Sequence, residues 1–135
     1  MHKYIKVLII CLLSIVLLCS CNPKSKQFKN AKNTALEIAG QIHGGKNSFS
    51  IDTKASLVPF DEMSSMQRNL HTRMEKQAIE AIINTNITLG FDSTLYDKMM
   101  ETTEADGKKY EENESYRVSW AYAYNDGLEV TYELK

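Results

Sequence analysis

The sequence predicts an α+β domain, in which a small antiparallel sheet packs against two amphipathic helices. Three observations predict it: two segments with apolar residues at helical spacing, one alternating strand in the N-terminal half, and an alternating β-hairpin at the end of the printed sequence. None of these elements can bury its apolar face alone, so we expect them to form one layered domain. Once an apolar leader is set aside, about 115 residues remain, enough for a single domain.

The first helix is expected within residues 28–42, where apolar side chains recur every three or four positions. Gly44-Gly45 is expected to end this helix. From Ser48 to Val58 apolar and polar residues alternate, which predicts a strand with one buried face, closed by Pro59. The apolar helix positions are Phe28, Ala31, Ala35, Ile38 and Ile42.

A second, longer helix is expected to begin after Ser64, because Gln67 three residues later completes a capping box. Asn84-Thr85-Asn86 is expected to weaken its end, since Asn and Thr are poor helix formers. A short third helix capped by Ser93 is expected next, followed by an exposed connection with a short strand over residues 109–110. The apolar stripe of the long helix comprises Met63, Met66, Leu70, Met74, Ala78 and Ile82.

The end of the sequence predicts the β-hairpin. Residues 116–124 and 128–134 alternate between apolar and other side chains, and Asn125-Asp126-Gly127 between them is typical of a tight turn. Aromatic side chains on one sheet face can form a core, stack on sugar rings or anchor a protein partner, and we interpret this face chiefly as core. The candidate binding residues on it are Trp120, Tyr122 and Tyr124.

The charge pattern argues against nucleic acid as a partner. The formal net charge is −1, and loss of Lys3 and Lys6 with a leader leaves 14 basic and 17 acidic residues. From Asp61 onward eight bases face fifteen acids, so most of the domain is acidic. It offers no basic face that could neutralise phosphates.

Residues 1–20 have the pattern of an export signal peptide. A basic start precedes an apolar run over residues 7–18, and about 12 residues are too few to cross about 30 Å of hydrocarbon. Every cysteine lies at or before position 21, so the expected domain contains none and can form no disulfide. These cysteines are Cys11, Cys19 and Cys21.

The segment Leu18-Cys19-Ser20-Cys21 resembles the lipobox of bacterial lipoproteins. The resemblance implies that Cys21 receives a diacylglyceryl group, that the chain is cleaved after Ser20, and that the new amino terminus is acylated. Asn22 stands where Asp would signal retention in the inner membrane, which implies sorting to the outer membrane. The alternative is an ordinary signal peptide cut near Ser20 or Cys21, or a retained signal anchor.

These features divide the chain into three parts: the signal peptide at residues 1–20, the lipidated cysteine with a short polar tether at residues 21–27, and one α+β domain at residues 28–135. Four lysines near the tether either lie against anionic headgroups or form a solvated linker and helix face. They are Lys24, Lys26, Lys29 and Lys32.

No motif predicts a catalytic group, a metal or a cofactor. Residues 40–47 come within one residue of a phosphate-binding P-loop, but Asn47 replaces the required Ser or Thr. A helix precedes and a strand follows, the reverse of the P-loop order, so a glycine helix cap is the better interpretation. His71 and Glu75 lie one helical turn apart without a third ligand in view. We therefore expect no enzyme.

Together these observations favour a non-catalytic protein-interaction module carried by a lipoprotein of the cell envelope. Its anchor is the membrane lipid at Cys21, and its expected partner is an envelope or extracellular protein. The alternative is a small sugar-binding accessory protein or a small envelope enzyme, either of which would need a concave site.

Overall fold

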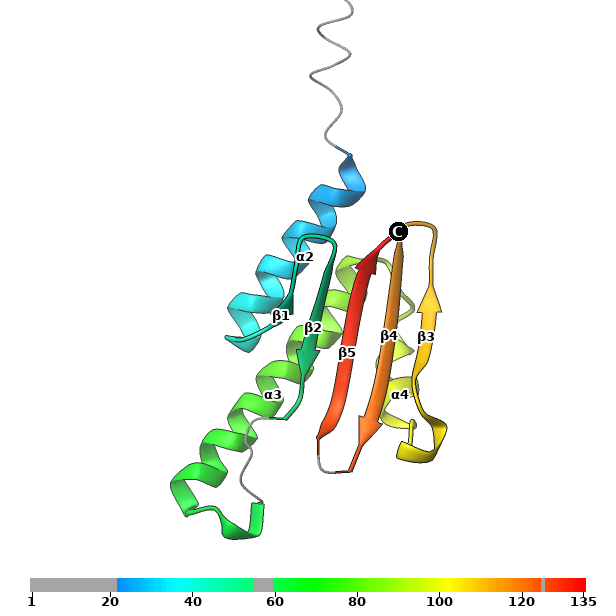
Figure 1. Ribbon diagram of the computed structural model, residues 1–135. Helices are drawn as coiled ribbons and strands as arrows, with labels where there is room; N and C mark the ends of the chain where they lie inside the picture. The colour runs from blue at the N-terminus through cyan, green and yellow to red at the C-terminus, as the bar shows by residue number, and fades with distance from the viewer. Residues whose placement is uncertain (1–21, 55–59, 125) are drawn as a thin grey trace, which may run out of the picture.

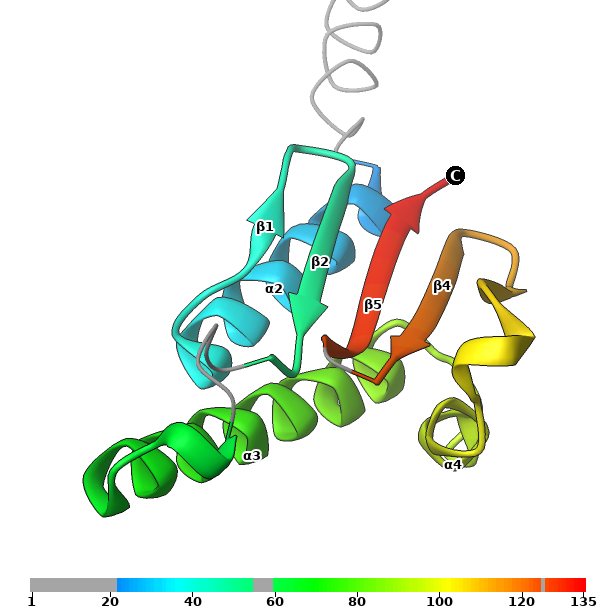
Figure 2. The same cartoon turned by 60° about the horizontal axis from the view of Figure 1, so that its bottom comes forward.

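A computed structural model describes residues 22–54, 60–124 and 126–135. These residues form a five-stranded antiparallel sheet with the helices packed on one of its faces, as Figures 1 and 2 show. The predicted α+β class is confirmed. The leader with its apolar run and Cys21, residues 55–59 and residue 125 lie outside the described residues.

The sheet order is β1-β2-β5-β4-β3, so the C-terminal hairpin lies at its centre. Ile51 of β2 and Trp120 of β4 both pair with Val130 of β5, which sets the register of the three long strands. The elements are α2 (Pro23–Ala39), β1 (His43–Gly44), β2 (Ser48–Asp52), η1 (Phe60–Glu62), α3 (Ser65–Thr88), α4 (Leu95–Met100), η2 (Glu104–Asp106), β3 (Lys109–Glu112), β4 (Tyr116–Ala123) and β5 (Gly127–Leu134).

The first helix differs from its expected bounds at both ends. It begins at Pro23, because the Asn22 side chain accepts a hydrogen bond from the Lys24 amide (3.1 Å) and proline suits the first helical position. Residues 23–27, expected as part of a tether, are therefore helical. The helix ends at Gly40 rather than at Gly44-Gly45, because Gly40 takes the left-handed conformation (φ 73°) of a helix cap.

The long helix begins as expected, with both hydrogen bonds of the Ser64–Gln67 capping box present. It does not weaken at residues 84–86 but continues to Thr88. The reason is tertiary: Thr85 and Asn86 are buried, and the Tyr132 hydroxyl lies 2.8 Å from Asn86 Oδ1. Burial against the sheet outweighs the low helix propensity of these residues.

Two further expectations differ from the structure. The third helix follows Thr94 rather than Ser93, because Asp92 binds the Thr94 amide and hydroxyl in a turn. β2 ends at Asp52, whereas a strand was expected from Ser48 to Val58, of which residues 55–58 lie outside the described residues. β3 and both strands of the hairpin form as predicted.

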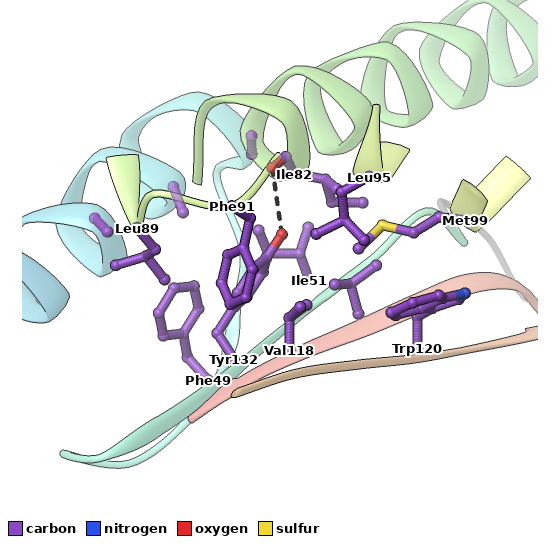
Figure 3. Packing of buried hydrophobic residues seen from close by; sticks show 14 of the residues in the cluster. Phe49, Ile51, Ile82, Leu89, Phe91, Leu95, Met99, Val118, Trp120 and Tyr132 are labelled. Atoms are coloured by element: carbon purple, nitrogen blue, oxygen red, sulfur yellow. Dashed lines mark hydrogen bonds between the residues drawn. The ribbon is translucent and has the colours of Figure 1, made fainter. Parts of the chain in front are cut away.

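The core lies between the sheet and the helices (Figure 3). Phe49 stacks on Tyr132 at 5.2 Å and packs against Phe28 of α2 at the same centroid distance. Leu95 and Met99 of α4 are fully buried over the other half of the sheet, on the side of Trp120. Because α4 is short, it covers only part of the hairpin and leaves its end uncovered.

Candidate functional site

A groove of about 780 Å³ opens where the β4–β5 hairpin turns. It is bounded by the hairpin, by the first half of α3 and by α4, with η1 at its mouth. The groove lies at the end of the domain opposite the start of α2, as Figure 1 shows from the position of the hairpin turn and of η1.

The first half of α3 extends past the edge of the sheet and forms one wall of the groove (Figure 2). No residue of α3 before Ala78 is buried, although the helix begins at Ser65. This first half contacts η1, where the Phe60 ring meets the His71 ring edge-on at 5.9 Å and Arg68 lies over the Phe60 ring. The first half of α3 is therefore stabilised by its continuity with the buried second half and is free to present its side chains to another surface.

The structure separates the three candidate aromatic residues. Trp120 is 3% exposed, and its indole N–H donates a hydrogen bond to the Thr102 hydroxyl at 2.8 Å, so it belongs to the core. Tyr122 and Tyr124 line the groove and are 37% and 81% exposed. Strand alternation places Tyr122 on the same face as Trp120, but it lies nearer the uncovered end of the hairpin.

Carboxylates give the groove a negative character. Lys54 and Asp126 line it and form an ion pair with each other. Asp61 and Glu75 also line it, and neither makes an ion pair within the part of the chain that the structure describes. The pKa of Tyr96 is raised, first by burial and then by the negative charges of Glu75 and Asp97.

His71 and Glu75 face this groove from successive turns of α3. The Nδ1 atom of His71 is shielded from solvent and has no hydrogen-bond partner among the described residues. No group of three or more His, Cys, Asp or Glu side chains that could hold a metal occurs in residues 22–54, 60–124 and 126–135. The groove therefore offers aromatic surface and negative charge rather than a ligand set for a metal.

The other motifs lie away from the groove. Residues 40–47 run from the cap of α2 through β1 to the β1–β2 turn, and they do not form the strand-to-helix turn of a P-loop.

None of the helices that the structure describes is both long and apolar enough to span a bilayer.

Sequence reasoning missed most of this site. Phe60, Asp61 and Tyr96 come from segments that carried no functional signal, and they meet the hairpin only in the folded chain. The sequence carried one signal: Met66 and Leu70 continue the apolar stripe of α3, yet they are exposed in the structure.

Comparison with known proteins identifies no relative, since no protein-family model, curated protein or solved structure matches the chain.

Proposed function

We propose that this protein is a lipid-anchored binding protein of the bacterial cell envelope, held on the outer membrane through Cys21. Its domain binds another envelope or extracellular protein in the groove beside the β4–β5 hairpin and performs no catalysis. The lipobox-like residues 18–21 support the anchor. The groove supports the binding role.

The observation that carries the binding role is the gathering of exposed apolar side chains around one concave site. Tyr124 and Met100 line the groove with large exposed surfaces, and Phe60 stands at its mouth. Met66 and Leu70, outside the groove lining, are further exposed apolar side chains on the first half of α3. Aromatic and methionine side chains at a partly concave surface are typical of protein interfaces, where they supply most of the binding energy.

The charge of the groove indicates which partner it favours. Asp61 and Glu75 line the groove together with Tyr96 and Tyr124, and besides burial the charge of nearby Glu75 raises the pKa of the Tyr96 hydroxyl. Carboxylates next to aromatic rings bind lysine and arginine side chains through charge and through cation–π attraction, worth about 0.5–2 kcal/mol per contact. A partner segment that carries a basic residue therefore fits this site.

Site-specific photocrosslinking in cells tests the binding role. A photoreactive residue at Tyr124 should give one discrete protein adduct, whereas the same residue at Tyr110, exposed on β3 away from the groove, should give none. Replacing Glu75 by Gln should reduce the adduct at position 124, because the groove loses a negative charge. Equal adducts at both positions, or none at Tyr124, would contradict the proposal.

A fatty-acid analogue tests the anchor separately. The wild-type protein should incorporate the label and Cys21→Ser should not, since only Cys21 has the lipobox context. Label of unchanged intensity on the variant would contradict the lipid anchor.

The second candidate is a small sugar-binding protein. Two exposed tyrosines and three carboxylates in one groove can stack on a sugar ring and accept hydrogen bonds from its hydroxyls. Titration with envelope oligosaccharides separates the two functions: saturable binding that is lost in Tyr122→Ala and Tyr124→Ala favours the sugar. Crosslinking to a protein at Tyr124 in the absence of such binding favours the protein partner.

A further inference from the structure

The start of α2 is fixed to the rest of the domain. The Tyr116 hydroxyl lies 2.9 Å from the Lys24 carbonyl oxygen and 3.1 Å from Gln27 Oε1. The Gln27 amide donates a hydrogen bond to the Thr88 carbonyl oxygen at the end of α3 (2.6 Å). Phe28 follows with a fully buried ring. The helix therefore has no hinge between its first turn and the core.

Very little chain separates this fixed helix from the proposed lipid. Only Asn22, which caps the helix, stands between Cys21 and Pro23. Two residue steps span at most about 7 Å. A lipid on Cys21 thus places the same end of the domain at the bilayer surface. That end also contains the β1–β2 turn and the β3–β4 turn, and the groove lies at the other end (Figure 1).

The end of the domain near Cys21 is basic. Lys24, Lys26 and Lys46 are exposed there and have no ion-pair partner in the described ranges. Lys135 lies at the same end and contacts Glu112 at 3.3 Å. Glu114 in the β3–β4 turn and Glu133, which pairs with Ser48 in the sheet register, are the other acids at this end. The groove at the far end has the opposite character, because Asp61 and Glu75 line it and form no ion pair among the described residues.

We propose that Lys24, Lys26 and Lys46 form a membrane-facing surface that rests on anionic phospholipid headgroups and holds the groove pointing away from the bilayer. This inference rests on the lipid anchor of the proposed function. Lys24 and Lys26 lie in the first turns of α2, three and five residues after Cys21 in the sequence, and Lys46 lies in the β1–β2 turn at the same end of the domain. Anionic headgroups attract basic side chains within about one Debye length, 8–10 Å at physiological salt. The short connection at Cys21 keeps this surface close to the bilayer. The lysine charges determine how the domain is tilted relative to the bilayer plane.

Fluorescence quenching in reconstituted vesicles tests the orientation. The mature lipidated protein has no cysteine after Cys21, so a single introduced cysteine can be labelled selectively. Asn47→Cys places the label in the β1–β2 turn and Asn69→Cys places it on the first half of α3, and both positions are exposed. Vesicles containing phosphatidylglycerol carry a quencher on the lipid headgroup.

We expect the label at position 47 to be quenched several-fold more strongly than the label at position 69. Equal quenching of the two labels on protein that floats with the vesicles would overturn the inference and leave the anchor intact. Protein that does not float with the vesicles would instead overturn the anchor. The two failures are therefore distinguishable.

Charge reversal tests the part played by the lysines. In Lys24→Glu/Lys26→Glu the difference between the two labels should shrink markedly, whereas the matched control Lys76→Glu/Lys108→Glu, at exposed positions away from this surface, should keep it. High salt and wholly zwitterionic vesicles should also reduce the difference. A difference that survives all three changes would show that the lysines do not contact anionic headgroups and would overturn the proposal.

Discussion

Trp120 and Tyr124 differ in role because of how far each lies from the end of the hairpin. Trp120 is covered by α4 and hydrogen-bonded to Thr102, whereas Tyr124 follows the last residue of β4 and is largely exposed. The same alternating pattern thus supplies a core residue and a groove residue. Stability and binding can therefore be altered independently along this strand.

We expect Trp120→Ala to lower the free energy of unfolding by about 3–5 kcal/mol, because it leaves a large cavity and an unpaired Thr102 hydroxyl. Tyr124→Ala is the matched control and should stay within about 0.5 kcal/mol of the wild type. Denaturant unfolding followed by far-UV circular dichroism measures both. An unchanged midpoint for Trp120→Ala would contradict its place in the core.

Tyr132 forms a buried polar contact at the centre of the sheet. Its hydroxyl lies 2.8 Å from Asn86 Oδ1 and 3.2 Å from the Ile82 carbonyl oxygen, and Figure 3 shows the second contact. Burial raises the pKa of Tyr132 well above its ordinary value of 10.0. The folded protein therefore keeps this proton at pH values at which the unfolded chain releases it.

This difference predicts a loss of stability in alkali. A tyrosine whose pKa is raised on folding contributes stability that is complete below the unfolded pKa of about 10 and is lost as the pH rises above it. Tyr132→Phe should be less stable at neutral pH by about 1–3 kcal/mol, because Asn86 loses its partner. Its stability should decline less than that of the wild type between about pH 9 and pH 11. Tyr124→Phe, at an exposed position, is the control, and parallel declines for wild type and Tyr132→Phe would contradict the assignment.

At the scale of elements, α2 and α3 both begin well before their first buried residues. α2 begins five residues before Phe28, and its first turn is held by Tyr116 and Gln27. α3 begins thirteen residues before its first buried position, Ala78, and forms a wall of the groove. The first extension is held against the sheet and the end of α3, and the second forms one wall of the proposed binding groove.

The start of α2 gives a prediction from truncation. A fragment of residues 22–135 should be more stable than a fragment of residues 28–135 by about 1–3 kcal/mol, because the shorter one loses the helix cap, the first turn and two side-chain contacts. Thermal and denaturant unfolding of the two fragments measure the difference. Identical stabilities would show that residues 22–27 act as the tether that the sequence suggested.

At the scale of the whole molecule, the domain has two ends of opposite character. The end next to Cys21 carries lysines that form no ion pair with any residue that the structure describes, and the far end carries the groove with Asp61 and Glu75. The sheet and its core separate the two ends. A protein built this way can attach at one end and bind a partner at the other without either contact disturbing the core.

The position of the cysteines predicts that stability does not depend on redox conditions. All three precede residue 22, so the fold cannot contain a disulfide. The fragment of residues 22–135 should have the same melting temperature with and without reductant. A shift of the melting temperature on adding reductant would contradict this prediction.

The sequence by itself determined the class and order of the elements. Helical and alternating periodicity, the Ser64–Gln67 capping box and the Asn125-Asp126-Gly127 turn are signals within a few residues of each other, and backbone geometry links such signals directly to local structure. The alternating hairpin and the long helix were predicted for this reason. The Asn22-Pro23 cap was also present in the sequence, but its polar neighbours favoured a tether.

Only the tertiary structure decided which apolar faces are covered and where the groove lies. Trp120 and Tyr122 share one strand face, and α4 buries the first and leaves the second partly exposed. Phe60, Glu75 and Tyr96 meet at the groove because η1, the first half of α3 and α4 flank the same end of the sheet. Periodicity reports which residues could be buried, whereas burial itself depends on the length and position of elements far away in the sequence.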